Sequence, residues 1–548
     1  MTVTLTINGQ SIEAASDRSL FEHAEALDID VPTSCRKQGK CKECMVEVVD
    51  GMDLLSARAE PEQHLKGNFR LSCQTFVAGA TGHVRCHTMR RGQMRIERHA
   101  PGLPGAEERA HLDPAVTRDG DRILIDGVEA DRSTAPIHGI AMDLGTTTIV
   151  LRLMNLETGE LVADTSFENP QRFGGSEVMS RIAYDTEHPG RLLMRTLAGY
   201  LSHAIEKFPV DPKTIYEMVV VGNSTMRDLF FRQNVYSIGQ SPYQSITEIE
   251  MAEGKRATTS LAQTGLHSLL PIHPKARVYG APIISGHVGA DAAAGMLAVD
   301  MANQEELIAI MDIGTNTELI VGNRHRMLAA SCPAGPAFEG GAIACGMPAL
   351  DGAIEAVQVR ADSSFELGVI GNEKPEGICG SGLVDALSEL LRTGRMNEYG
   401  RFEDDLHRID FYRDEEREVY LLERDVNELA QAKGANVAGL QVVFSTYGIS
   451  FDEISTFYLS GGFGRHIGVE AAKRIGLVPN LAPAKIVQAG NTAIEGATIA
   501  LLSKARRQEL EEMVKRVQHC RLETHPGFFD FFVEGCQFKP VESMPCLT

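Results

Sequence analysis

The sequence predicts a mixed α/β and α+β multidomain protein, with a small cysteine-containing module, a linker and two similar α/β lobes. Three observations lead to this prediction. The chain has 548 residues, too many for a single core, because domains average roughly 150 residues. Five of its 11 cysteines lie before residue 87. A short motif around Asp143 recurs around Asp312, which indicates an internal duplication.

Composition and charge exclude several classes of function. Hydrophobic residues make up 43% of the chain and charged residues 23%, so most of it should fold. The net charge of -21 disfavours nucleic acid and anionic membranes as partners, because both are polyanions. No apolar run reaches the ~18 residues of a membrane span, and the first residues do not resemble a signal peptide. We therefore expect a cytoplasmic protein.

The first 88 residues follow the pattern of a β-grasp module. Residues 2–7 alternate in the manner of a strand, and the Asn-Gly pair that follows favours a hairpin. Ser19 and Glu22 have the spacing of a capping box, so we expect a helix over 20–27. A cysteine-rich loop and a strand over 45–49 come next. This order of hairpin, helix, loop and strand predicts a domain over 1–88.

Residues 89–136 are polar and contain several prolines and glycines, so we interpret them as a linker with room for local structure. The stretch begins with a run of basic side chains. Such a run is most often a solvated surface, and the alternative is a docking patch for an acidic partner. Its members are Arg85, Arg90, Arg91, Arg95 and Arg98.

The spacing of the early cysteines indicates ligation. Cys35 is followed by Cys41 after five residues and by Cys44 after two more, and Cys73 comes 28 residues later. Disulfides are rare in the cytosol, so such a cluster predicts metal or cofactor binding. The pattern resembles that of [2Fe–2S] ferredoxins, of which the plant type has C-x4-C-x2-C and a distant fourth cysteine. The longer first gap resembles the vertebrate- and bacterial-type ferredoxins.

A zinc site with four cysteine ligands and unrelated buried cysteines are the alternatives to a cluster. Structural zinc usually pairs two C-x2-C knuckles, and this sequence has one. Cys86 could replace Cys73 as the fourth ligand, but Leu71 and Gln74 around Cys73 resemble the ending of ferredoxin modules. We therefore predict a [2Fe–2S] cluster, with four ligands: Cys35, Cys41, Cys44 and Cys73.

The repeated motif predicts a phosphate-binding loop in each lobe. Each copy follows an apolar strand with Asp, an apolar residue, Gly and Thr, which suits a tight strand–turn–strand that offers backbone N–H groups and hydroxyls to phosphate. Asp143 and Asp312 suit Mg²⁺ bound through water, and we take them as the catalytic pair. A third Gly-rich turn follows the strand near 456–459 and suits an adenosine. The predicted nucleotide-binding residues are Gly145, Thr146, Thr147, Thr148, Gly314, Thr315, Asn316, Thr317, Gly461, Gly462, Phe463 and Gly464.

These three segments, in this order, resemble the superfamily of acetate and sugar kinases, heat-shock-70 chaperones and actin. The resemblance implies two actin-like (ribonuclease H-like) α/β lobes around an ATP site, which we place at 137–303 and 304–548. The alternative is three unrelated Gly-rich turns. The sequence has no G-x-x-x-x-G-K-[ST] motif, so a P-loop enzyme is not expected.

A [2Fe–2S] module fused to such an ATPase resembles the reductive activators of corrinoid-dependent methyltransferases. Four further segments are similar to that family, at 221–226, 285–291, 333–340 and 377–382. The resemblance implies an ATPase that passes an electron from its cluster to an inactive Co(II) corrinoid and restores Co(I), whose couple lies below that of the ferredoxin. It also implies a corrinoid-protein partner, an upstream low-potential reductant and a homodimer. The alternatives are a redox-sensing chaperone-like ATPase, an activator of a radical dehydratase and a kinase.

Overall fold

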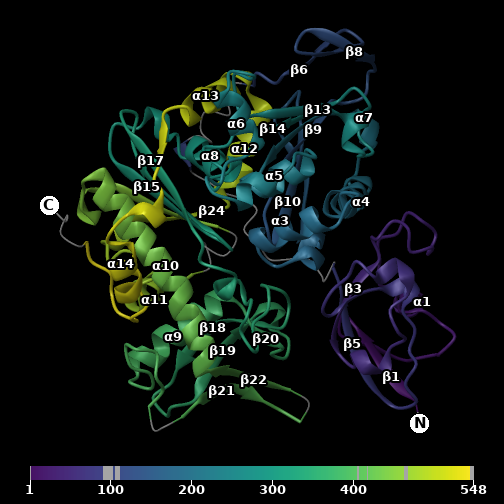
Figure 1. The fold of residues 1–548 in the computed structure, drawn as a ribbon, viewed down its shortest axis with the longest axis vertical. Coiled ribbons are helices and arrows are strands. Elements are labelled where there is room, and N and C mark those ends of the chain that lie inside the picture. The colour runs from purple at the N-terminus through teal and green to yellow at the C-terminus, as the bar shows by residue number, and fades with distance from the viewer. Residues whose placement is uncertain are drawn as a thin grey trace. The chain divides into compact units, whose positions relative to one another are not determined.

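A computed structural model describes residues 2–89, 103–104, 112–403, 406–415, 417–461 and 467–543. Its contacts divide the chain into two compact units, which are described separately below (Figure 1). The first unit comprises Met1–Gln93, Pro114–Val220 and Thr225–Gly280, and the second comprises Met94–Asp113, Val221–Ser224 and Ala281–Thr548. None of the helices in the described ranges is both long and apolar enough to cross a membrane.

The N-terminal module has the β-grasp fold that the sequence predicts. Its helix α1 (Leu20–Ala26) begins with the predicted capping box, in which Ser19 and Glu22 each bond the other's backbone. The sheet has the order β2 (Gln10–Glu13), β1 (Val3–Ile7), β5 (Gly82–Thr88), β3 (Met45–Asp50) and β4 (Phe69–Leu71). Strand β1 pairs in parallel with β5 and antiparallel with β2, while β3 pairs antiparallel with β5 and β4.

The predicted linker contains a small sheet of its own. Its described part forms three antiparallel strands: β6 (Val116–Asp119), β7 (Arg122–Ile125) and β8 (Val128–Arg132). Of the basic run at its start, Arg85 lies in β5, and the four later arginines lie outside the described residues.

The first lobe is built on a six-stranded sheet. The strands run in the order β11 (Leu161–Glu168), β10 (Thr148–Asn155), β9 (His138–Leu144), β12 (Ile215–Val221), β14 (Arg277–Gly280) and β13 (Leu261–Thr264). Its helices are α3 (Val178–Glu187), α4 (Leu192–Glu206), α5 (Ser224–Phe230), α6 (Ile246–Ala252) and α7 (Gly265–Ser268). Strand β12 is buried at every position, as a central strand covered on both faces must be.

The second lobe repeats this plan. Its main sheet has the order β24 (Ile486–Gly490), β23 (Thr456–Ser460), β15 (Ile308–Ile313), β16 (Thr317–Gly322), β17 (Met327–Cys332) and β25 (Val517–His519). The orders β11-β10-β9-β12-β14 and β17-β16-β15-β23-β24 are the same. The duplication seen in the motif therefore extends to five of the six strands in each sheet, and the predicted pair of ribonuclease H-like lobes is confirmed.

Helices and small sheets complete the second lobe. The long helix α10 (Glu423–Tyr447) packs on β16 and β17 and against α14 (Phe528–Gly535). Helices α8 (Ala290–Ala298) and α12 (Thr492–Leu502) pack on each other, and α13 (Lys504–Val514) joins them. The remaining elements are α9 (Gly380–Arg392), α11 (Val469–Ile475), β18 (Ala353–Val359), β19 (Phe365–Val369), β20 (Gly377–Ile378), β21 (Arg408–Arg413) and β22 (Glu418–Leu422).

Candidate functional site

The cysteine loop curls tightly between α1 and β3. Four of its residues have left-handed backbone conformations: Arg36, Lys37, Gly39 and Lys42. At Gly39 a Cβ atom would lie 2.9 Å from Pro61 Cβ, so the loop needs glycine there for close approach as well as for its φ. The N–H groups of Gln38, Lys40 and Cys41 face the sulfur of Cys35, so the loop forms a cradle for anionic sulfur.

The loop and the turn after β4 bring the four predicted cysteines together as two pairs. Cys44 Sγ and Cys73 Sγ lie 3.2 Å apart, and the thiols of Cys35 and Cys41 hydrogen-bond each other. Within the described parts of the chain, no three His, Cys, Asp or Glu side chains converge on a point that one metal ion could occupy. Two thiol pairs fit a cluster of two irons, in which each iron takes two thiolates.

Hydrogen bonds already favour thiolate at two of these positions. The thiol of Cys44, the Gln74 amide and the Gly39 N–H lower the pKa of Cys73 to about 6, against the effect of its burial. Burial also opposes ionisation of Cys35, but N–H groups of Cys41, Lys40 and Gln38 hold its pKa below the ordinary value. The pKa of Cys44 is raised, because its thiol donates to Cys73 and is buried. Each of the two thiol pairs thus contains one cysteine whose pKa is lowered and that accepts hydrogen bonds from backbone N–H groups. An iron–sulfur cluster needs both features.

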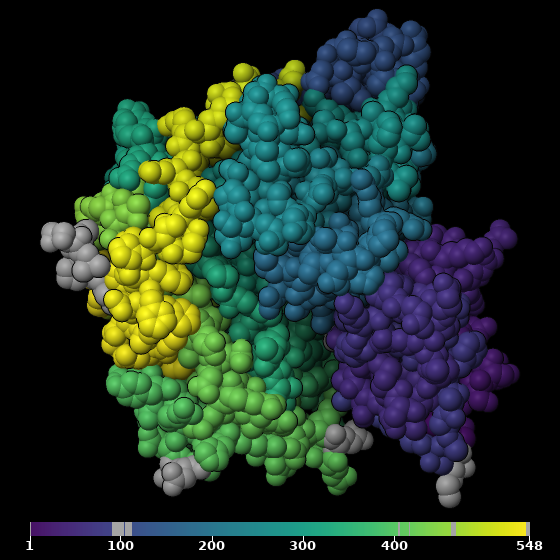
Figure 2. All heavy atoms as spheres, viewed as in Figure 1, coloured from purple at the N-terminus to yellow at the C-terminus, as the bar shows by residue number. Residues whose placement is uncertain are grey.

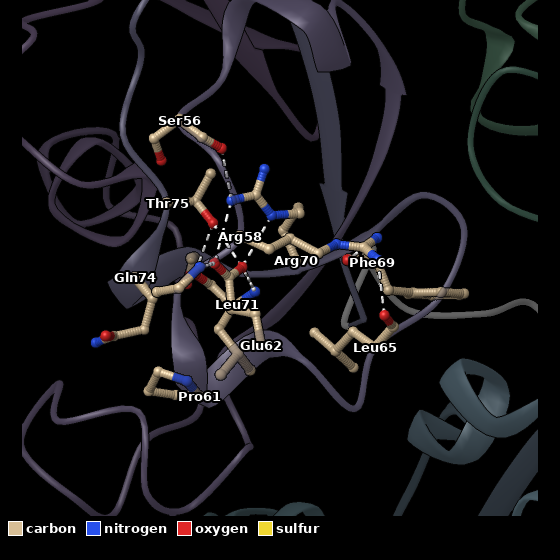
Figure 3. A network of polar contacts seen from close by, with 12 residues as sticks. Ser56, Arg58, Pro61, Glu62, Leu65, Phe69, Arg70, Leu71, Gln74 and Thr75 are labelled. Carbon is tan, nitrogen blue, oxygen red and sulfur yellow. Dashed lines mark hydrogen bonds and ion pairs between the residues drawn. The ribbon is translucent and has the colours of Figure 1, made fainter.

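A buried ion pair fixes the turn that carries Cys73 (Figure 3). Glu62 and Arg70 are 0% and 2% exposed. Glu62 Oε1 accepts from Arg70 Nε at 2.8 Å, from the N–H of Leu71 at 3.0 Å and from Thr75 Oγ1 at 3.1 Å. Leu71 and Thr75 flank Cys73 on either side, so one carboxylate holds both ends of the turn.

Cys86 is placed differently from the other four. It lies in β5, where its backbone pairs with β1 and β3, and it is 0% exposed. Burial alone raises the pKa of its thiol to about 12. This is the environment of a small apolar core residue.

The first predicted phosphate loop joins β9 to β10. Asp143 lies near the end of β9, and the loop turns so sharply that a Cβ at Gly145 would lie 2.5 Å from the Thr148 carbonyl oxygen. Two buried side chains brace it: Asn169 Nδ2 donates to the Gly145 carbonyl at 2.8 Å, and Arg181 Nη2 donates to the Thr146 carbonyl at 2.7 Å. Because these two hydrogen bonds hold the carbonyl groups of the loop, its backbone has a fixed shape.

The second loop joins β15 to β16 at the same place in its sheet. Gly314 N–H donates to the Asn316 carbonyl at 3.1 Å, and Thr315 Oγ1 donates to Glu339 Oε2 at 2.5 Å. Asp312 Oδ2 accepts from Ser460 Oγ at 3.0 Å, and that hydroxyl lies 2.7 Å from Thr492 Oγ1. Ser460 ends β23, so the Asp is held by the strand beside its own.

Two further carboxyl groups, which no sequence motif indicated, lie near Asp312. Glu318 stands directly opposite Asp312 in the β15–β16 pair, and Asp291 lies in the first turn of α8. Desolvation raises the pKa of Asp291 to about 7 and that of Asp312 to about 6, and it raises the pKa of Glu318 well above the ordinary value. The charges of Asp291 and Asp312 add to the effect on Glu318. The only signal was position, since Glu318 follows the second motif directly.

The third predicted segment is described at its first residue only. Gly461 follows β23 with a φ of 108°, and a Cβ there would lie 2.3 Å from the Ile313 carbonyl oxygen. Glycine is therefore required where the chain passes the second phosphate loop. Gly462, Phe463 and Gly464 lie outside the described residues.

A cysteine-lined module on the same chain as a duplicated phosphate-loop fold defines an ATPase linked to an electron carrier. Three family models match this chain, one after another along the sequence. They are the 2Fe-2S iron-sulfur cluster binding domain over residues 3–78, the RACo middle region over 138–304, and the C-terminal domain of RACo, the ASKHA domain, over 306–547. These matches contain every predicted site residue.

Two curated relatives and one solved structure agree with these matches. The corrinoid activation enzyme RamQ of Eubacterium limosum is 32% identical over 447 residues, which are 76% of this chain and 73% of that protein. The [Co(II) methylated amine-specific corrinoid protein] reductase of Methanosarcina barkeri is 25% identical over 431 residues, 72% of this chain and 76% of that protein. A reductive activator for a corrinoid, iron–sulfur protein shares the fold, with a TM-score of 0.70 and 24% identity over 98% of each chain. The chain belongs to the family of reductive activators of corrinoid proteins.

Proposed function

We propose that this chain reduces the Co(II) corrinoid of a methyltransferase corrinoid protein to Co(I), using its [2Fe–2S] cluster as electron carrier and ATP as driving force. One observation carries the proposal: the two thiol pairs of the β-grasp module stand on the same chain as two braced phosphate loops. The ligands of the proposed cluster are Cys35, Cys41, Cys44 and Cys73. A bound cluster supplies one-electron chemistry, and the polypeptide supplies the thiolates and the N–H donors around them.

The need for ATP follows from redox arithmetic. A plant-type [2Fe–2S] centre lies near about -400 mV, and the family resemblance puts the Co(II)/Co(I) couple lower. For one electron, about 59 mV corresponds to a factor of ten, so a gap of ~100 mV costs about 2.3 kcal/mol. ATP can supply this if its binding and hydrolysis change the affinity for the Co(II) and Co(I) forms of the partner. This is a coupling between two binding sites.

We assign the nucleotide to the two loops and the third segment. Thr146, Thr147 and Thr148 offer hydroxyls and N–H groups to phosphate oxygens from the first loop, and the second loop does so with the N–H groups of Thr315 and Asn316 and the hydroxyl of Thr317. Asp143 and Asp312 would hold Mg²⁺ through water, since Mg²⁺ keeps several of its waters when bound. Adenosine lies against the Gly-rich segment that Gly461 begins.

A single-turnover assay tests the proposal. A purified Co(II) corrinoid protein from the same cell is mixed anaerobically with the chain and a chemical reductant, and the Co(I) absorbance is followed with and without Mg·ATP. We expect ATP-dependent Co(I) formation that is lost in Cys41→Ala and in Asp312→Ala. Cys86→Ala is the matched control, because Cys86 packs in the sheet away from the thiol pairs. ATP hydrolysis without Co(I) from any candidate partner favours the chaperone-like or dehydratase-activating alternatives.

The remaining partners are proposals of the same kind. We propose that a low-potential one-electron donor re-reduces the cluster between turnovers, and that the active protein is a homodimer, as the family resemblance implies. Anaerobic titration with candidate donors tests the first, and light scattering at assay concentration tests the second.

A further inference from the structure

Helix α4 of the first lobe packs closely against one residue of the cysteine loop, Glu43. Tyr200 is fully buried, and its Oη donates to the Glu43 carbonyl oxygen at 2.7 Å. Glu43 lies between Cys41 and Cys44. Next to Tyr200, a Cβ at Gly199 would lie 2.7 Å from the carboxyl carbon of Glu43, so a glycine is needed for this approach. The helix therefore holds residue 43 in place. We call this contact of Glu43 with Tyr200 and Gly199 the seat of the module.

The side chain and N–H of Glu43 extend this seat to the cysteines. Its Oε1 accepts from Ser34 Oγ at 2.6 Å, and its Oε2 lies 3.3 Å from His203 Nε2 on α4. Ser34 directly precedes Cys35, so the carboxylate joins both ends of the loop to the helix. The N–H of Glu43 donates to the sulfur of Cys41. Glu43 thus connects α4 to a proposed cluster ligand, because its carbonyl accepts from Tyr200 and its N–H donates to Cys41.

Other contacts hold the module on the lobe around this centre. Tyr184 Oη donates to the His64 carbonyl at 3.1 Å. Residues of the module and of the lobe belong to one continuous apolar core, and in Figure 2 the purple module directly adjoins the blue lobe. Ion pairs lie along the rim: Arg172 with Glu47, Lys66 with Glu187, and Lys207 with Asp30.

We infer that α4 sets the reduction potential of the cluster, with Tyr200 as a positioning residue that acts through Glu43 on the sulfur of Cys41. Hydrogen bonds to cluster sulfurs and solvent exposure are main determinants of such potentials. While the module is seated, Tyr200 fixes the residue whose N–H reaches Cys41. The inference rests on the ligand set proposed above and needs neither ATP nor a corrinoid partner.

A pair of tyrosine variants tests the tuning. Tyr200→Phe removes the hydroxyl that holds residue 43, and Tyr184→Phe removes the hydroxyl that holds His64, which lies outside the cysteine loop. Redox titrations of the full-length holoprotein are followed by electron paramagnetic resonance, with iron and sulfide content measured on each sample. We expect a more negative midpoint and altered g-values for Tyr200→Phe only. Equal midpoints and spectra for Tyr200→Phe and the wild type, at full cluster content, would overturn the inference.

Cross-linking tests the seat independently of the cluster's spectrum. A zero-length carbodiimide should join Lys207 to Asp30 in the native protein, because their side chains form an ion pair. Gly199→Val should abolish this cross-link and shift the midpoint, whereas Glu206→Val, at an exposed position of α4, should do neither. Valine is a better helix former than glycine, so α4 itself is not weakened. An unchanged midpoint in a Gly199→Val protein that has lost the cross-link contradicts the inference. A shifted midpoint with no Co(I) formation leaves it standing and counts against the proposed function instead.

Discussion

At the scale of single residues, Glu62 does the most to hold the cysteine site together. It is fully buried and bonds Arg70, the N–H groups of Ala59 and Leu71, and the hydroxyl of Thr75. Burial opposes its ionisation, but Arg70 and the two N–H groups hold its pKa below the usual range. Breaking one partner of such a pair leaves the other charge buried and uncompensated.

We therefore expect Glu62→Gln to lower the free energy of unfolding of the module by about 3 kcal/mol, because Arg70 loses its counter-charge. The turn that carries Cys73 should loosen, and the cluster should be lost at lower denaturant concentration. Denaturation followed by the visible absorbance of the cluster measures both effects. Glu60→Gln, two residues away and exposed, is the control and should behave as the wild type. Equal midpoints for the two variants would show that the pair does not support the site.

The functional residues that sequence spacing indicated have their partners close by in the sequence or in a repeated motif. Those that only the structure showed have partners far away in the sequence. The cysteines stood out because three lie on one loop, and the Asp-x-Gly-Thr motif because it occurs twice. Glu43 gave no such signal, because His203 lies 160 positions further along the chain. Asp291 and Glu318 likewise needed the strand pairing and the helix start to bring them near Asp312.

At the scale of elements, local signals predicted well where they were strong. The capping box at Ser19 and Glu22 gave the start of α1 at the right residue. The sheet β6–β8 was not foreseen in the linker, because its strands have four or five residues each and contain several charged side chains. Their alternation is too short to stand out from a polar segment.

A buried lysine ties α14 to α10, and its removal should show how much this contact contributes. Lys433 is 0% exposed, burial lowers its pKa to about 7, and its Nζ donates to the carbonyls of Gly535 and Gln537 at the end of α14. Lys433→Met keeps the stem but leaves both carbonyls without this donor, so we expect about 2 kcal/mol lower stability in chemical denaturation. Lys515→Met, at an exposed lysine, is the control and should change little. A Lys433→Met protein as stable as the wild type would refute this role.

At the scale of the whole molecule, duplication explains the architecture, and the differences between the copies indicate the chemistry. Both lobes share one strand order and one loop position. Where the first copy has Ile149, the second has Glu318, beside Asp312 and with Asp291 in the same unit. The second unit therefore holds three desolvated carboxyl groups close together, an arrangement that costs stability unless protons or a cation compensate it.

This cost should make the stability of the nucleotide-free protein depend on pH. The folded-state pKa values of Asp291 and Asp312, about 7 and about 6, lie above their unfolded value of 3.8. The folded state thus binds more protons between pH 4 and 7, and the free energy of unfolding falls as pH rises through this window. One pKa unit is about 1.4 kcal/mol, so Asp291→Asn should be more stable than the wild type by at least about 1 kcal/mol at pH 8. At pH 4 the two should differ little.

Thermal unfolding across this pH range measures the effect, with Glu373→Gln, at an exposed carboxylate, as the control that should follow the wild type at every pH. If Mg²⁺ binds beside Asp312 as proposed, Mg·ATP should stabilise the wild type at pH 8 more than it stabilises Asp291→Asn, because a cation bound to the folded state offsets the same repulsion. If Mg·ATP stabilised both proteins equally, the repulsion among these carboxyl groups would not be relieved by nucleotide binding. If the stability of the wild type and that of Asp291→Asn changed by the same amount from pH 5 to pH 8, Asp291 would carry no desolvated charge in the folded state.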